Sequence, residues 1–184
     1  MDNFKDTFLI AMPHLSETFF EKTVIYICDH GAQGAMGMVI NRPLASGKVA
    51  VVLESLGLTP TGGLKVMDVY YGGPVQPALG FVLHSSEYAI DDTEQISSRI
   101  SLSTNVGIFK DIQKGRGPDQ FRFTLGYAGW GASQLDQEIA NGDWLVVPAE
   151  PTFIFDIPDR SKWREAASRF GIEIAQFSGS GGVA

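Results

Sequence analysis

The chain has 184 residues, of which 44% are hydrophobic and 19% charged, as in an ordinary globular domain, and this indicates neither a disordered nor a membrane protein. Its formal net charge of −7 opposes general attraction to nucleic acid or anionic lipid. No apolar run reaches membrane-spanning length and the N-terminus lacks a signal-peptide pattern, so we expect a cytoplasmic protein without membrane contact.

The N-terminal quarter of the chain predicts three strands. Residues 7–12 form a short apolar run that ends at Pro13. Residues 23–28 are apolar on both faces and rich in β-branched side chains, which is typical of a central strand. After a glycine-containing turn, residues 35–40 predict the second strand of a hairpin, which ends at Asn41 and Arg42. Polar groups at such a strand end are well placed for function.

A helix and two further strands are predicted next. Residues 49–56 have apolar side chains at helical spacing, with Gly57 as the residue that ends the helix. Residues 58–65 predict a loop, and residues 66–71 a strand that runs into Gly72 and Gly73. An extended apolar run resumes over residues 79–84 and ends at His84.

Four acidic residues within residues 87–94 predict a solvated loop, since the spacing and glycine of a calcium-binding EF-hand loop are missing. Residues 95–102 alternate well enough to predict an edge strand. Ser103 or Thr104 could then cap a helix that ends at Gly115.

The stretch from residue 120 to residue 142 predicts a strand that breaks at Gly126 and a helix that follows. Trp130 would lie in the turn, Ser133 and Asp136 would form a pair like a capping box, and Gly142 would end the helix. The glycines permit either a tight packing turn or a ligand close to bare backbone N–H groups. They match neither a phosphate-binding P-loop nor a dinucleotide fingerprint, and the carboxylate of Asp136 would repel a phosphate.

The C-terminal part predicts a strand over residues 144–147, a last helix from residue 158 or 161 to 170, and a flexible tail over 176–184. The early hairpin and the uneven spacing of elements oppose a doubly wound parallel sheet. We therefore predict one α+β domain over residues 1–175, with a mixed, strongly curved sheet flanked by short helices.

No complete catalytic motif occurs in the chain, which argues against an enzyme without excluding one. Cys28, the only cysteine, lies in the most apolar strand, so we interpret it as a buried structural thiol. His30 and His84 end apolar runs, but two ligands without a third do not make a zinc site. We predict no metal and no cofactor.

Two segments are locally basic, each with a net charge of about +2, which is typical of a solvated helix face. A DNA reader usually shows a longer basic stripe or a recognisable reading helix. The basic residues of the first segment are Lys110, Lys114, Arg116 and Arg122, and those of the second are Arg160, Lys162, Arg164 and Arg169.

Four separated motifs, in order, resemble those of the YqgE/AlgH family of bacterial proteins. They are HGAQGAMGMVINRP (residues 30–43), YYGGPVQ (70–76), GFVLH (80–84) and GYAGWGASQLDQEI (126–139). The resemblance extends over nearly the whole chain and implies an α+β fold around a barrel-like sheet. The family has no established biochemical activity. One branch is described as regulating exopolysaccharide and virulence gene expression, which is why members are often labelled transcriptional regulators.

The resemblance implies no catalytic residue. One departure from the family pattern is Leu79, where an arginine is expected before Gly80, and this leaves Arg42 as the cation of the motifs. The family motif positions in this chain are Gly34, Gly37, Asn41, Arg42, Pro43, Gly72, Gly73, Pro74, Gly126, Trp130, Gln134 and Glu138. The candidate binding residues are Asn41, Arg42, Gly72, Gly73, His84, Trp130 and Gln134.

Three functions are consistent with these observations. The first is a regulatory or scaffold protein that contacts an unidentified protein partner through a groove lined by Asn41, Arg42, Gly73 and Trp130, since tryptophan and arginine dominate contact hot spots. The second is direct DNA binding through the basic segments, which the acidic net charge disfavours. The third is a sensor of a nucleotide or other small anion, or an unrecognised enzyme, at Arg42. The sequence predicts no oligomeric state.

Overall fold

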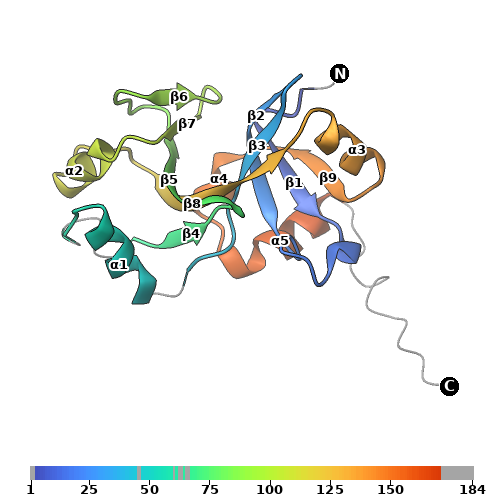
Figure 1. The fold of residues 1–184 in the computed structure, drawn as a ribbon, viewed down its shortest axis with the longest axis horizontal. Coiled ribbons are helices and arrows are strands. Elements are labelled where there is room, and N and C mark those ends of the chain that lie inside the picture. The colour runs from blue at the N-terminus through green and yellow to red at the C-terminus, as the bar shows by residue number, and fades with distance from the viewer. Residues whose placement is uncertain (1–2, 45–46, 60, 62–63, 65–66, 171–184) are drawn as a thin grey trace.

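The sheet of this protein curls into a half-barrel (Figure 1). The computed structural model describes residues 3–44, 47–59, 61, 64 and 67–170. Within the described residues, eight strands follow the order β6-β7-β5-β8-β3-β2-β1-β9, and the ninth, β4, pairs with β8 outside this path. Every pairing is antiparallel except the parallel pair of β4 and β8, so the predicted α+β fold with a mixed, strongly curved sheet is confirmed.

The elements are short, as the frequent turn residues predict. The strands are β1 (Thr7–Ala11), β2 (Val24–Gly31), β3 (Gly34–Val39), β4 (Val69–Tyr71), β5 (Val75–Ser85), β6 (Thr93–Gln95), β7 (Ile100–Ser103), β8 (Phe121–Trp130) and β9 (Trp144–Pro148). The helices are the 3-10 turn η1 (Pro13–Leu15), α1 (Gly47–Ser55), α2 (Gly107–Gln113), α3 (Gln134–Ala140), α4 (Pro151–Phe155) and α5 (Asp159–Arg169). Within the described residues, none of the helices combines the length and apolar character that a membrane crossing requires.

Strand alternation divides the core between the two faces of the sheet. In β1, Phe8 and Ile10 point to the inner face, where α4 and α5 cover them, whereas Leu9 and Ala11 point to the outer face under α3. A third apolar cluster joins α1 and α2 to β4, β5 and β8 at the other end of the molecule (Figure 1). The helices thus bury both faces of the curled sheet.

Several predicted elements are confirmed. The hairpin of β2 and β3 forms, and β2 is a central strand buried on both faces from Val24 to Cys28. The helices α1 and α3 are followed by Gly57 and Gly142, whose φ angles of +68° and +80° lie in the left-handed region that ends helices. The predicted tail, and residues 60, 62–63 and 65–66 of the predicted loop and strand, lie outside the described residues.

The predicted break at Gly126 is wrong. Strand β8 continues through this glycine to Trp130, which is the last residue of the strand rather than part of a turn. The capping pair is also wrong, because Ser133 has a left-handed φ of +59° and its side chain makes no capping bond. Gln134, the first residue of the helix, bonds the turn before it instead, because its Oε1 accepts a hydrogen bond from the Gly131 N–H at 3.0 Å.

Two further boundaries differ from the prediction. Residues 95–102 form not one edge strand but parts of β6 and β7, because Ile96 to Arg99 make the turn between these strands. Ser103 belongs to β7, and the helix α2 is instead preceded by Asn105, whose Oδ1 accepts a hydrogen bond from the Gly107 N–H at 2.8 Å. The predicted acidic loop is solvated as expected, since Glu87, Asp91, Asp92 and Glu94 are exposed.

The chain crosses over its own strand β8 between β4 and β5. These two strands flank β8 on opposite sides, because Phe123 to Leu125 pair with both of them. A Cβ on Gly73 would lie 2.1 Å from the backbone of Tyr127, and a Cβ on Gly72 or Gly126 would meet backbone oxygen at 2.4 Å. Glycine is therefore required at all three positions so that one backbone can pass directly over the other.

Candidate functional site

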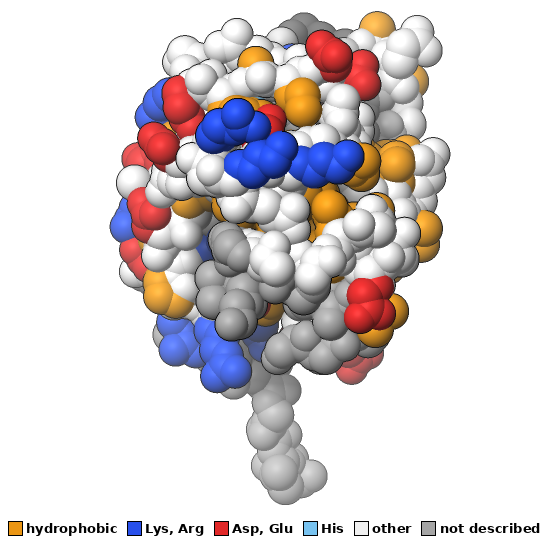
Figure 2. All heavy atoms as spheres, turned by 90° about the vertical axis from the view of Figure 1, so that its left-hand side faces the viewer, with side chains coloured by type: hydrophobic (Ala, Val, Ile, Leu, Met, Phe, Trp, Pro, Cys, Tyr) orange, Lys and Arg blue, Asp and Glu red, His pale blue; other side chains and the backbone are white. Residues whose placement is uncertain are grey.

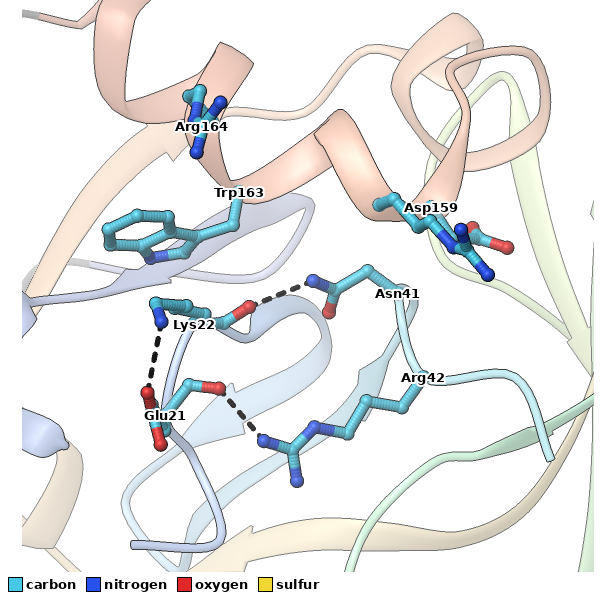
Figure 3. Close-up of a pocket in the computed structure, with 8 residues that line it drawn as sticks. Glu21, Lys22, Asn41, Arg42, Asp159, Trp163 and Arg164 are labelled. Carbon is cyan, nitrogen blue, oxygen red and sulfur yellow. Dashed lines mark hydrogen bonds and ion pairs between the residues drawn. The ribbon is translucent and has the colours of Figure 1, made fainter. Parts of the chain in front are cut away.

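The candidate site is a pocket of about 330 Å³ between the turn before β2, the end of β3 and the first half of α5 (Figure 3). We call it the Arg42 pocket. Three segments far apart in the sequence build it, and in Figure 3 Asn41 and Arg42 lie across the opening from the helix, with their side chains directed toward Lys22 and Glu21. The lining residues are Glu21, Lys22, Asn41, Arg42, Asp159, Arg160, Trp163 and Arg164.

Asn41 holds the turn that forms one wall of the pocket. Its Oδ1 accepts a hydrogen bond from the Val24 N–H at 2.9 Å, and its Nδ2 donates one to the Lys22 carbonyl at 2.9 Å. Lys22 has a left-handed φ of +52°, which is unfavourable for a residue with a side chain. Asn41 therefore positions this turn.

Arg42 lies against the same turn. Its Nη2 donates a hydrogen bond to the Glu21 carbonyl at 2.8 Å, and its guanidinium stacks over the Phe19 ring at 4.9 Å. Partial burial lowers the pKa of Arg42, and the nearby charge of Glu21 opposes that shift, so the side chain stays cationic. Among the described residues, no carboxylate lies within 4.0 Å of the Arg42 guanidinium.

A buried ionic network lies behind the pocket and centres on Asp159. Its Oδ1 receives both Arg122 Nη1 and Lys162 Nζ at 2.9 Å, and its Oδ2 accepts the Tyr70 hydroxyl at 2.9 Å. The guanidinium of Arg122 stacks on the Tyr70 ring at 3.9 Å and donates to the carbonyls of Ile40 and Ile154. Burial disfavours the charge of Asp159, but the two cations outweigh burial and lower its pKa.

This network carries more positive than negative charge. Arg122 and Lys162 are 6% and 0% exposed, yet they share the single carboxylate of Asp159. The Nε of Arg122 is buried and has no hydrogen-bond partner among the described residues. Burial, followed by the charge of Arg122, lowers the pKa of Lys162, while Asp159 opposes the shift. The wall behind the Arg42 pocket is therefore electropositive.

The network corrects the prediction that both basic segments are solvated helix faces. Arg122 and Lys162 are buried, whereas Arg160 and Arg164 are exposed and line the pocket. Basic side chains do gather in a short row on the side of the molecule that carries α1 and α2, with acidic side chains nearby (Figure 2). Arg116, just after α2, lies 3.6 Å from the carboxylate of Asp111, so its charge is partly compensated.

His84 lies away from the Arg42 pocket and is completely buried in β5. Its Nδ1 lies 3.0 Å from the Ser85 carbonyl, which can only accept, so Nδ1 carries the proton. Its Nε2 then accepts a hydrogen bond from the Ser103 hydroxyl at 2.9 Å. Burial lowers the pKa of His84, with opposition from the Ser85 carbonyl and the charge of Glu87.

Trp130 and Gln134 anchor α3 to the outer face of the sheet. The indole N–H groups of Trp130 and Trp144 both donate to Glu138 Oε2 at 2.8 Å, and Gln134 Nε2 donates to Glu138 Oε1 at 2.9 Å. Trp130 is only 7% exposed. The last sequence motif therefore encodes a hydrogen-bonded attachment of a helix to a strand.

The structure brings together only two of the seven candidate binding residues in the Arg42 pocket, namely Asn41 and Arg42. Gly72 and Gly73 lie at the crossing over β8, and Trp130 lines a separate hollow. The shared groove of Arg42, Gly73 and Trp130 does not form. Sequence reasoning missed Asp159 and Trp163 as lining residues. The spacing of Arg160 and Arg164, four residues apart on one helix face, was the available signal for the other wall.

These features define a single-domain α+β protein with a half-barrel sheet and a basic pocket beside its last helix. The chain belongs to the AlgH-like family, whose family model matches residues 8–175. The resemblance to the YqgE/AlgH family is thus confirmed.

Relatives agree over the full length of the chain. A UPF0301 protein of Shewanella oneidensis is 41% identical over 189 residues, with 100% of both chains covered. The solution structure of the AlgH protein from Pseudomonas aeruginosa matches with a TM-score of 0.78 and 39% identity, covering 99% of this chain and 96% of that one. A crystal structure of a Corynebacterium diphtheriae protein, at 20% identity, a TM-score of 0.74 and coverage of 98% and 94%, shares the fold.

Proposed function

We propose that this chain is a cytoplasmic regulatory protein that binds a small anion, carrying a phosphate or carboxylate group, in the Arg42 pocket. The charge imbalance of the pocket carries this proposal. Four basic residues line the pocket and only two acidic ones do. Both carboxylates are already paired, Glu21 with Lys22 at 3.1 Å and Asp159 with two buried cations. A protein with a net charge of −7 thus presents a local site for an anion.

The geometry of the arginines supports anion binding. Arg160 and Arg164 lie one helical turn apart on α5, and Arg42 lies on the opposite wall with its guanidinium directed toward Glu21 (Figure 3). Arg42 is held by the Glu21 carbonyl and the Phe19 ring, so little side-chain entropy is lost when it meets a ligand. Guanidinium groups favour the planar, two-point contact that carboxylates and phosphates offer.

The buried network gives the pocket a second source of positive potential. Arg122 and Lys162 share one carboxylate in a region of low dielectric, where their excess charge is poorly screened. A bound anion would offset that charge. The volume of about 330 Å³ lies within the range of pockets that take small metabolites.

Protein contact and direct DNA binding stay predictions. The protein-contact hypothesis loses its shared groove, because Arg42 and Trp130 line different pockets. The DNA hypothesis loses two of its eight basic side chains to burial, namely Arg122 and Lys162. A DNA phosphate could still reach the exposed arginines of α5, so the test includes a DNA duplex.

Calorimetric titration of the full chain at constant ionic strength tests the proposal. The titrants are inorganic phosphate, pyrophosphate, citrate and a short DNA duplex. The double variant Arg160→Ala, Arg164→Ala removes one wall of the pocket with exposed side chains, so the fold should survive. We expect a small anion to bind the wild type and the double variant to bind at least about 100-fold more weakly, since charge-assisted hydrogen bonds contribute about 1.5–3 kcal/mol each and two arginines are removed.

The matched control is Arg116→Ala, which removes an exposed arginine outside the pocket. It should bind like the wild type. A saturating anion should also raise the unfolding temperature of the wild type, because at 100 times Kd a ligand of the native state adds about 2.7 kcal/mol. If none of the small anions saturates, or if Arg116→Ala weakens binding as much as the double variant, the proposal is wrong. Binding of the duplex alone would support the DNA hypothesis instead.

A further inference from the structure

A second hollow, of about 420 Å³, lies on the inner face of the sheet where β3 meets the end of β8. Side chains alternate along β8, so Tyr127 and Gly129 fall on one face, and Gly131, directly after the strand, also lines the hollow. Gly129 pairs with Met36 of β3, and Met36 and Tyr127 both pack against the inner-face core. The hollow therefore exists because two glycines supply no side chains to this face. We call it the glycine hollow.

The fold does not require glycine at these two positions. Neither residue has a left-handed φ, in contrast to Gly126 at +69°. A Cβ on Gly131 would come no closer than 3.8 Å to any described atom beyond its chain neighbours, and a Cβ on Gly129 would touch only the edge of the Tyr127 ring, at 3.1 Å, and looser side-chain atoms. Glycine in a strand weakens it and often marks a place where a ligand approaches the backbone.

The lining of the hollow selects a particular ligand chemistry. Apart from Asp29, its lining consists of the apolar or aromatic residues Ala35, Met36, Val75 and Tyr127, the polar residue Gln33, and backbone. Trp130 contributes backbone, since its indole packs on the outer face under α3. Asp29 is the only ionisable acid or base in the lining besides the Tyr127 phenol.

The charge of Asp29 is not compensated. Asp29 is exposed, and no basic group of the described chain lies within 4.0 Å of its carboxylate. Lys5 and Asp29 both influence the pKa of the Cys28 thiol, but Lys5 pairs with Glu94, at 3.3 Å, and not with Asp29. The Tyr127 hydroxyl has no hydrogen-bond partner among the described residues. The hollow thus combines an apolar floor with an unpaired anion at its rim.

We propose that the glycine hollow binds a small organic cation, an ammonium compound with an aromatic or aliphatic body. The ammonium group pairs with Asp29, and the apolar body lies over Gly129 and Gly131 against the Tyr127 ring. Aromatic rings and carboxylates together are the usual recognition elements for ammonium groups. The hollow shares no residue with the Arg42 pocket and has the opposite charge, so this site does not depend on the proposed function.

Titration of the full chain with 2-phenylethylamine and with neutral 2-phenylethanol, followed by NMR shifts of backbone amides, tests this site. The amine should bind with saturation and at least 10-fold more tightly than the alcohol, and the shifts should centre on residues 127–131. In Asp29→Asn that preference should fall to about twofold or less, because the variant keeps the shape of the hollow and removes its charge.

Two further variants make the test decisive. Gly129→Ala places a methyl group beside Tyr127 and Val75, which line the hollow, and should weaken the amine and the alcohol alike. Asp92→Asn removes an exposed carboxylate elsewhere on the surface and should leave both affinities unchanged. The site is refuted if the amine does not saturate, if the alcohol binds equally well, or if Asp29→Asn and Asp92→Asn have the same effect.

Discussion

Replacing Asp159 with asparagine would leave two buried cations without their shared carboxylate. The carboxylate accepts Arg122 and Lys162 on one oxygen and the Tyr70 hydroxyl on the other, each at 2.9 Å. Asparagine keeps the size of the side chain and one acceptor oxygen but removes the charge. Removing one partner of a buried ion pair typically costs about 3–5 kcal/mol. The free energy of unfolding of a small domain is about 5–15 kcal/mol, so we expect Asp159→Asn to lose a large part of it.

Lys162→Met should behave very differently, although it removes a charge from the same network. Burial and the charge of Arg122 lower the pKa of Lys162, so its charged form is less favoured in the folded protein than in the unfolded chain. After the change, Arg122 and Asp159 still form a matched pair. The methionine fills a similar apolar volume, so the cost should stay below about 1.5 kcal/mol.

Urea unfolding at pH 7, monitored by tryptophan fluorescence and circular dichroism, measures both variants. Glu165→Gln is the matched control, because it breaks an exposed pair with Arg169 on the same helix and should change the free energy of unfolding by at most about 1 kcal/mol. The pKa of Asp159 is lowered by folding, so its contribution is present at neutral pH and is lost as the pH falls through the folded pKa. A loss in Asp159→Asn no larger than in Glu165→Gln would refute the reasoning.

Four other substitutions test the geometry. Glu138→Ala removes the acceptor of two indole N–H groups, so we expect a loss of about 2–4 kcal/mol in urea unfolding and a shifted tryptophan emission; unchanged emission would contradict it. Gly57→Ala should cost about 1 kcal/mol through its positive φ, whereas Gly126→Ala, which also meets backbone oxygen at 2.4 Å, should cost at least twice as much by the same assay. Folding lowers the pKa of His84, so its neutral ring contributes stability above about pH 6.5, and this contribution is lost as the pH falls. The free energy of unfolding, measured at pH 7, 6 and 5, should therefore fall less steeply in His84→Gln than in the wild type.

Local patterns predicted most of the strands and helices. The alternation in β1 and the apolar run of β2 match their burial, and the helix-ending glycines after α1 and α3 have the positive φ angles expected of them. These features depend on neighbours within a few residues, so the sequence alone contains the required information.

The continuation of β8 through Gly126 could not be predicted in this way. A glycine with a left-handed φ commonly ends a strand, and only the passage of residues 72–74 over this point explains why the strand continues. The contact joins residues more than fifty positions apart, and no local periodicity encodes it. The sequence therefore identifies three glycines as family motif positions but does not show why glycine is required there, namely Gly72, Gly73 and Gly126.

The candidate site was predicted only at its strand end. Asn41 and Arg42 stood out as polar residues after an apolar strand, and they do line the pocket. The opposite wall depends on how α5 packs over the curled sheet, which turns Lys162 inward and Arg160 and Arg164 outward. By composition these three residues look alike, so the charge pattern could not separate them.

The order in which strands leave the ribosome has a consequence for folding. Strands β3, β4 and β5 all pair with β8, which is synthesised completely only when the chain reaches Trp130. Strand β1 pairs with β9, which is synthesised later still, at residues 144–148. A nascent chain shorter than this presents several unpaired apolar strand edges, because their partners have not yet been synthesised. Such long-range pairing slows folding, so the half-barrel can close only after nearly the whole chain has been synthesised.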